Sequence, residues 1–389
     1  MFDDSTVNVG VLKERAYNLR WATVPEGVIP LTAADPDFPS APEIAESLTK
    51  FIKDRYLCYG PPDGLPQFKE SVSQFFRQKR NVPANPAYTM PVDSAAFGIY
   101  VICKAFLGKG DEAIIFNPVD FLFKYSVETV GAIAIPYSIP SGKESVDFTE
   151  IEALITPKTK MICLCNPLNP TGKVFSAEEL NVLGTIAVKH NLIILSDEIW
   201  SDIVFQPFCY TSIASLDEAI RQQTIIVTGY SKSYGLAGLR IGSILAFNQA
   251  HFDKVFQASL HQSTVHGANV LGQIAVTTAL NECGYWLEGF ISHLQKMRDL
   301  CVAELSSSKG VSIIPPQGCY VAFADITGTG KTSAEIHAYL LETAKVAIVP
   351  GLPQWFGSEA EGYIRLSFAT SNEILSNALY HIKTALNNL

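Results

Sequence analysis

The chain has 389 residues, of which 48% are hydrophobic and 17% charged, and this composition excludes an intrinsically disordered chain. Its 29 Lys and Arg residues against 38 Asp and Glu residues give a net charge of −9, which argues against nucleic acid and anionic membranes as partners. We find no signal-peptide pattern and no apolar run of membrane-spanning length, so the sequence predicts a cytoplasmic location.

Helical and strand-like segments alternate through the middle of the chain. A helix is expected over 94–107, and the pair Ser176 and Glu179 forms a capping box that opens a second helix ending near residue 190. Short Ile-rich runs predict buried strands at 112–116, 160–165, 191–196, 224–228 and 241–247. This alternation is typical of a mostly parallel sheet covered by helices.

The pattern changes after Trp286. The segments that follow are an expected helix to about residue 308, strands at 311–314 and 319–323, a helix at 332–344, a strand at 363–368 and a final helix. We therefore predict an α/β protein with a large domain over 45–285 and a smaller α+β domain over 286–389. Residues 1–44 form an amino-terminal arm and part of the small domain.

Four motifs follow one another at the ends of predicted strands. Asn166-Pro-Leu-Asn169-Pro-Thr-Gly172 and Ser196-Asp197-Glu198 come directly after two buried strands, where open α/β sheets place their ligands. Ser231-Lys232-Ser-Tyr-Gly-Leu-Ala-Gly-Leu-Arg240-Ile-Gly242 follows a third strand. The fourth motif, Tyr363-Ile-Arg365-Leu-Ser-Phe368, places one Arg in an apolar strand, where its charge needs an anionic partner.

Taken together, these motifs resemble those of the fold-type I pyridoxal-phosphate enzymes, the aspartate-aminotransferase-like family of class I and II aminotransferases. The resemblance runs from about Pro30 to the last residues of the sequence. It implies a pyridoxal-phosphate-dependent transferase fold and transfer of the α-amino group of an amino acid to a 2-oxo acid. It also implies pyridoxal 5′-phosphate as the cofactor, and we predict no metal.

The resemblance also implies roles for individual residues. Lys232 would form the Schiff base with the cofactor and move the α-proton, and Asp197 would keep the pyridine nitrogen protonated. Asn169 would bind the ring oxygen and the substrate, and Arg365 would bind the substrate α-carboxylate. Ala34 would also contact the substrate.

The cofactor phosphate needs cationic and amide donors. The residues that the resemblance assigns to it are Arg240, Ser231, the backbone N–H groups of Ser94, Ala95 and Ala96, and Tyr59 of a neighbouring subunit. A shared phosphate site of this kind implies a homodimer.

Three positions depart from the family pattern. Trp200 stands where a Tyr is usual and is expected to contact the cofactor, and Asp120 stands where an aromatic ring usually stacks on it. Phe121 or Phe123 could take over the stacking, or the ring could be held differently. The phosphate turn, at Ser94, lacks its usual glycine.

The amino-terminal segment supports a second interpretation. The segment Arg15-Ala-Tyr-Asn18-Leu-Arg20-Trp21 followed by Ile29-Pro-Leu-Thr-Ala-Ala-Asp35-Pro-Asp37-Phe38 is similar to the carbon–sulfur β-lyases of this fold, the cystathionine β-lyase-like subgroup. We predict an aminotransferase, with the β-lyase as the alternative. A third hypothesis, from a different class, is a cofactor-binding protein without turnover.

Overall fold

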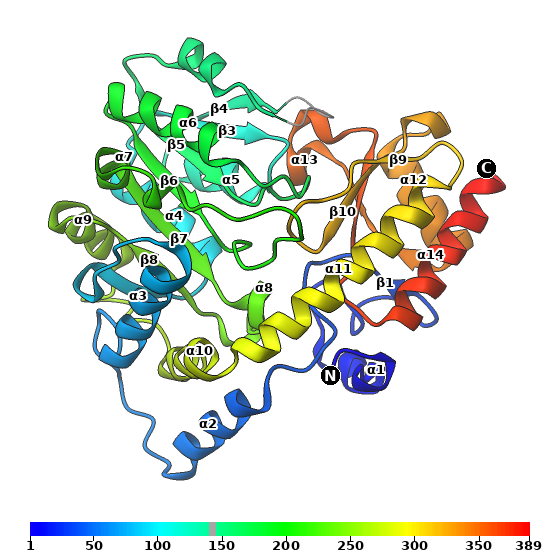
Figure 1. Ribbon diagram of the computed structural model, residues 1–389, viewed down its shortest axis with the longest axis horizontal. Helices are drawn as coiled ribbons and strands as arrows, with labels where there is room; N and C mark the ends of the chain where they lie inside the picture. The colour runs from blue at the N-terminus through cyan, green and yellow to red at the C-terminus, as the bar shows by residue number, and fades with distance from the viewer. Residues whose placement is uncertain (140–144) are drawn as a thin grey trace.

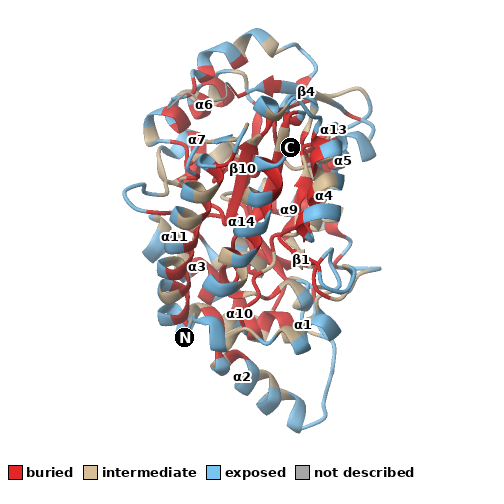
Figure 2. Ribbon diagram, turned by 90° about the vertical axis from the view of Figure 1, so that its right-hand side faces the viewer, coloured by how far each residue is buried: buried red, intermediate tan, exposed pale blue. Residues whose placement is uncertain are grey.

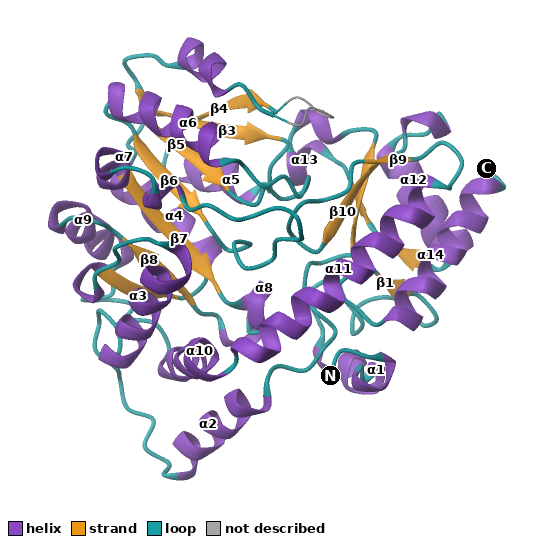
Figure 3. Cartoon of the chain, viewed as in Figure 1, coloured by secondary structure: helices purple, strands orange, loops and turns teal. Residues whose placement is uncertain are grey.

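The computed structural model describes residues 1–139 and 145–389, and these form a large sheet, a smaller sheet and their covering helices. The large sheet has seven strands in the order β2-β8-β7-β6-β5-β3-β4, drawn in orange in Figure 3. Its strands are β2 (Thr89–Val92), β3 (Glu112–Asn117), β4 (Ile133–Ser138), β5 (Thr159–Cys165), β6 (Ile193–Asp197), β7 (Thr224–Gly229) and β8 (Gly242–Leu245). The pairs from β4 through β7 are parallel, as predicted, whereas β8 runs antiparallel to both β7 and β2.

Two layers of helices cover this sheet (Figure 1). α4 (Ala95–Phe106) packs on β6, β7 and β8 next to α5 (Leu122–Thr129) and α9 (Gln249–Ser259). On β6 and β7, α6 (Ala177–Lys189) and α7 (Glu218–Gln223) pack together. α6 begins at the predicted capping box, in which the Ser176 and Glu179 side chains each accept from the other's backbone N–H. The other helices of this part are α2 (Pro42–Lys53), α3 (Pro66–Arg80), α8 (Ser231–Tyr234) and α10 (Val270–Glu282). Figure 2 shows the strands buried between the helices.

The smaller sheet is antiparallel throughout and has the order β12-β13-β10-β9. Its strands are β9 (Ser312–Ile313), β10 (Val321–Asp325), β12 (Val349–Pro350) and β13 (Tyr363–Ser367), and the helices around it are α11 (Gly284–Ser306), α12 (Ser333–Tyr339), α13 (Pro353–Phe356) and α14 (Asn372–Asn387). The helix predicted over 332–344 is α12 followed by a π-helical turn over Leu340–Ala344.

The amino-terminal arm carries α1 (Val9–Arg15) and then β1 (Ile29–Pro30), which pairs in parallel with β11 (Val346–Ala347) in a separate two-stranded sheet. Arg20 is buried, and its guanidinium bonds the Asp37 carboxylate at 2.5 Å and the Pro30 carbonyl at 2.8 Å. The Trp21 indole donates to the same carboxylate at 2.9 Å. These contacts tie two segments of the arm to each other, since Pro30 and Asp37 also belong to residues 1–44, while Asp37 Oδ2 is buried without a partner among the described residues.

Two expectations concern the chain as a whole. Among the described residues, no helix is both long and apolar enough to cross a lipid bilayer, and the cytoplasmic location stays a prediction.

One buried hydrophobic cluster includes Phe68 and Ala275 as well as Val321 and Leu366, so residues on both sides of the predicted boundary at 285/286 share a core. The division into a large and a small domain also stays a prediction.

Candidate functional site

A pocket of about 750 Å³ opens where β5, β6 and β7 end, and its other walls come from the start of α4, the amino-terminal arm and β13. The predicted site residues that line it are Ala34, Ser94, Ala95, Ala96, Asn169, Asp197, Trp200, Ser231, Lys232, Arg240 and Arg365. Tyr59 does not line the pocket: its ring is 87% exposed and lies 5.4 Å from that of His266. The structure therefore gathers every predicted residue except Tyr59, while their roles stay predictions.

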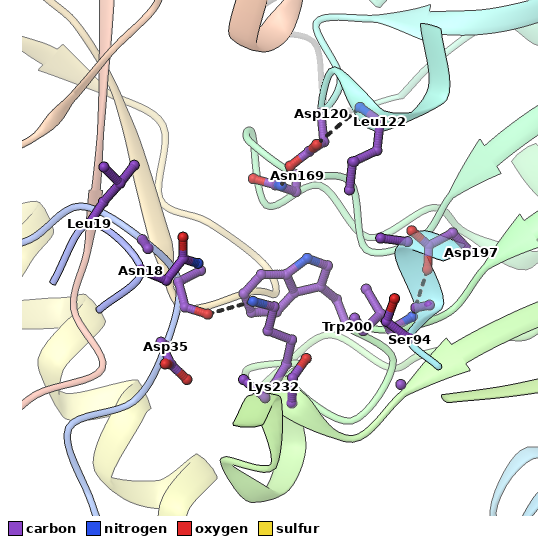
Figure 4. Close-up of a pocket in the computed structure, with 18 of the residues that line it drawn as sticks. Asn18, Leu19, Asp35, Ser94, Asp120, Leu122, Asn169, Asp197, Trp200 and Lys232 are labelled. Atoms are coloured by element: carbon purple, nitrogen blue, oxygen red, sulfur yellow. Dashed lines mark hydrogen bonds between the residues drawn. The ribbon is translucent and has the colours of Figure 1, made fainter. Parts of the chain in front are cut away.

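Lys232 projects from α8 into the centre of the pocket (Figure 4). Its Nζ donates to the carbonyl of Ala34 at 2.5 Å and lies 5.3 Å from the centre of the Trp200 ring. Burial lowers the pKa of the Lys232 amine, and the neighbouring Asp35 carboxylate offsets part of that effect. A larger share of this amine is therefore uncharged and nucleophilic near neutral pH than for an exposed lysine.

Asp197 is the last residue of β6 and is buried at the floor of the pocket. Within the described parts of the chain, its carboxylate accepts one hydrogen bond, from the Ile199 backbone N–H at 3.1 Å, and forms no ion pair. Burial is the main cause that raises the pKa of Asp197 to about 7. A buried carboxylate without a cation is costly, so this position suits a ligand that brings a positive charge.

The start of α4 forms one end of the pocket. The Ser94 side chain caps the helix by accepting from Phe97 N at 3.1 Å, so the first helical residue is Ala95 and its N–H faces the helix end. Gly242 of β8 allows a close approach here, because a Cβ on it would lie 2.9 Å from Ala95 N. The Arg240 guanidinium lines the same pocket and has no hydrogen-bond partner among the described residues. Free amide donors and an unpaired guanidinium together suit an anion such as a phosphate.

Arg365 lies in β13 on the opposite wall and is buried. Its Nη1 donates to Asn169 Oδ1 at 3.2 Å and its Nη2 to the Thr32 carbonyl at 3.3 Å, while Nε has no partner among the described residues. The guanidinium also lies 5.0 Å from the ring of Phe356. An arginine whose present acceptors are neutral oxygens, and which keeps a free N–H, can bind a carboxylate from a ligand.

Trp200 and Asp120, two of the three departures from the family pattern, both line the pocket. The Trp200 ring packs edge-on against Tyr320 at 4.7 Å beneath the Lys232 amine. Phe121, Leu122 and Phe123 all line the pocket. Phe121 also packs against Trp355, with ring centres 5.5 Å apart, and Phe123 is almost fully buried. Leu122 extends toward the interior of the pocket (Figure 4). Stacking of Phe121 or Phe123 on the cofactor ring therefore stays a prediction.

Sequence reasoning missed one wall of the pocket. The segment 15–19 lines the entrance, with Asn18 and Leu19 drawn in Figure 4, and Asp35 lies close by. Burial raises the pKa of the Asp35 carboxyl. Residues 15–19 carry no strand-end or glycine signal of their own, whereas Asp35 could have been found as the neighbour of the predicted Ala34.

Comparison with known proteins gives concordant results. A family model described as aminotransferase class I and II matches residues 26–382. The chain is 30% identical to the aspartate aminotransferase of Pyrococcus abyssi, over 92% of each protein, and 30% identical to that of Geobacillus stearothermophilus, over 95% of this chain and 94% of the relative.

Solved structures agree with this picture. The aromatic aminotransferase of Pyrococcus horikoshii superposes with a TM-score of 0.87 at 27% identity, covering 94% of this chain and 97% of that one. Cystalysin from Treponema denticola gives a TM-score of 0.90 over 100% of both chains at 22% identity, a likeness that bears on the fold alone.

Proposed function

The chain belongs to the aminotransferase class I and II family, and we propose that the pocket residues described above carry out its amino-group transfer. The protein is a pyridoxal-phosphate-dependent aminotransferase whose substrates are an amino acid and a 2-oxo acid. The names of its relatives favour this activity, and the carbon–sulfur β-lyase alternative is not better supported.

The residues of the pocket fit pyridoxal 5′-phosphate, which a solved relative also contains. The unpaired carboxylate of Asp197 suits a protonated ring nitrogen, and the unpaired Arg240 guanidinium and the start of α4 suit the phosphate. When bound, the cofactor supplies an electron sink for the negative charge left on the substrate α-carbon.

Residues of the chain itself would attach the cofactor, move the α-proton and bind the substrate. Lys232 would hold the cofactor through Nζ and, once released, would take the α-proton at the same atom, whose pKa its burial lowers. Asp197 stabilises positive charge beside it on the ring. Arg365 binds the α-carboxylate and Asn169 orients ring oxygen and substrate, so that the α-proton lies within reach of Lys232.

One observation carries this proposal: Asp197, a buried carboxylate that forms no ion pair with any described residue, lies in the same pocket as Lys232, a buried amine. The test is to incubate the loaded enzyme with a panel of amino acids plus 2-oxoglutarate and, separately, with cystathionine. We expect glutamate and the new 2-oxo acid to form in equal amounts from at least one amino acid. Cystathionine should give no sustained release of pyruvate and ammonia.

Two outcomes would decide against this assignment. Fast pyruvate and ammonia release from cystathionine, without amino transfer to any 2-oxo acid, would support the β-lyase. Loading with cofactor but no turnover of any amino acid would support a binding protein without catalysis. The Lys232→Ala chain serves as the blank in every reaction.

We also propose a homodimer in which Tyr59 reaches the phosphate of the partner's site. The segment around Tyr59 exposes several large apolar side chains, namely Ile52 at 45%, Tyr56 at 78%, Leu57 at 66% and Tyr59 at 87%. Apolar side chains exposed in succession are typical of a surface that another chain covers. A second copy of this chain is the occupant that the family resemblance implies.

The dimer is tested by sedimentation and by complementation. Tyr59→Phe alone should weaken cofactor affinity about 10- to 100-fold, the value of one hydrogen bond to a charged group. A mixed dimer of Lys232→Ala and Tyr59→Phe chains should contain one intact site, because both defects fall in the other site. Its active sites should therefore bind cofactor with normal affinity. A fully active monomer, or weak affinity in the mixed dimer, would rule out the shared site.

A further inference from the structure

Asp120 places a carboxylate in the pocket between β3 and α5. Its Oδ1 accepts from the Leu122 backbone N–H at 3.2 Å, and its Oδ2 accepts from Asn169 Nδ2 at 3.0 Å. Asn169 Oδ1 in turn accepts from Arg365 Nη1 at 3.2 Å. Three side chains thus form one line of hydrogen bonds from the turn after β3 to the arginine in β13, and Figure 4 shows the Asp120 and Asn169 side chains side by side.

This line determines which way the Asn169 amide points. A carboxamide has nearly the same shape after a half-turn that exchanges its oxygen and nitrogen, so its hydrogen-bond partners must select the orientation. An ionised Asp120 can only accept and the Arg365 guanidinium can only donate. The amide oxygen therefore faces Arg365. Asp120 reinforces this preference, because the flipped amide would turn its N–H groups towards the Arg365 guanidinium and its oxygen towards the Asp120 carboxylate.

Opposite charges also meet along this line: burial raises the pKa of the Asp120 carboxyl, and the Arg365 guanidinium offsets part of that effect. The described charged or titratable groups that act on Asp120 are Arg365, Lys232, Asp197 and Cys165. Arg365 is buried against neutral oxygens, and the negative charge of Asp120 counteracts the effect of that burial on the guanidinium. Asp120 therefore serves as the counter-charge of Arg365 while the substrate site is empty.

We propose that Asp120 is a positioning residue for the substrate carboxylate: it orients Asn169, and Asn169 holds the Arg365 guanidinium with Nε free to bind. The proposal rests on the proposed function, because it takes Arg365 as the residue that binds the substrate. In this proposal the Asp120 carboxylate orients Asn169, whereas an aromatic residue at this position would stack on the cofactor ring. The α-carboxylate is common to all amino acids, so the effect should not depend on the substrate side chain.

The test uses the cofactor-loaded enzyme and 3-phenylpropionate, a monocarboxylate that lacks an amino group and cannot react. Asp120→Ala should weaken its binding, measured by calorimetry, about 10-fold through the loss of an oriented hydrogen bond to a charged group. The KM of every amino donor should rise by a similar factor, with a smaller change in kcat. Asp120→Asn should lie between the two proteins, because one amide oxygen can replace only one of the two acceptors.

A double-mutant cycle separates positioning from other effects. In the Asn169→Ala background the Asp120→Ala change should have no further effect on 3-phenylpropionate binding, since Asp120 acts through Asn169. Equal losses in both backgrounds, unchanged affinity, or tighter binding on removal of the carboxylate would each overturn the proposal. If no amino acid transfers its amino group, the proposed function fails, yet calorimetry still reports whether Asp120 controls carboxylate binding. Cofactor absorbance and melting temperature show that each variant is folded and loaded.

Discussion

Replacing Lys232 by alanine is expected to lower kcat by about 10³- to 10⁴-fold, because the same amine carries the cofactor and moves the α-proton. That range lies at the upper end of what a single acid–base group contributes. The second expected effect is the loss of covalently attached cofactor. Borohydride reduction of the wild-type enzyme followed by peptide mass spectrometry should place the cofactor on Lys232, and the variant should give no modified peptide.

The matched control for this variant is Lys331→Ala, which removes an exposed lysine in the turn before α12. We expect it to keep its activity and its reduced adduct at position 232. An adduct on Lys331 or on Lys173 would show that the cofactor-binding lysine has been assigned wrongly. Recovery of activity on adding a small primary amine to Lys232→Ala would further support a proton-transfer role.

Replacing Asp197 by alanine is expected to leave cofactor attached but to lower kcat by about 10² to 10³-fold, the loss seen when one preorganised electrostatic group is removed. The physical reason lies in the burial of this carboxyl, which raises its pKa to about 7 although the Lys232 charge offsets part of the effect. A positively charged ring nitrogen would lower that pKa again and be stabilised in return. Without Asp197 the nitrogen loses its proton, and the ring becomes a poor electron sink.

Occupancy must be measured beside rate, because losing this contact also weakens cofactor binding. Absorbance of the dialysed variant gives the occupancy, and single-turnover kinetics give the rate per loaded site. The Asp197→Asn variant keeps the shape of the side chain but not its charge, so its rate should resemble that of the alanine variant. The matched control, Asp299→Asn, changes an exposed acid on α11 and should have the wild-type rate. Near-normal turnover in loaded Asp197→Ala would contradict the assigned role.

Local signals in the sequence were sufficient for most of the fold. The Ile-rich runs correspond to β3, β5, β6 and β7, and the capping box at Ser176 marks the start of α6. These features depend on neighbouring residues, so one sequence reveals them. The antiparallel direction of β8 and the presence of β2 and β4 depend on which strands pair, and pairing is decided by contacts between distant parts of the chain.

The same distinction explains the candidate site. Lys232, Asp197 and Asn169 follow strands that end at one edge of the sheet, so their proximity could be predicted. The orientation of Asn169 by Asp120 could not, because it depends on a hydrogen bond between segments 49 residues apart. The contact of the 15–19 segment with the pocket is equally non-local. Tyr59 is a different case, since the surface it is predicted to meet belongs to another chain.

The pairing of β1 with β11 has a consequence for the order of folding. It joins Ile29 to Val346 and so closes almost the whole chain into one loop. Closing so long a loop costs conformational entropy, and pairings between distant segments form slowly for this reason. The central sheet and the start of α4 can form first, because their strands lie closer together in the chain. The phosphate end of the pocket is thus expected to exist before the arm completes the entrance, so a nascent molecule could capture its cofactor while the substrate side is still open.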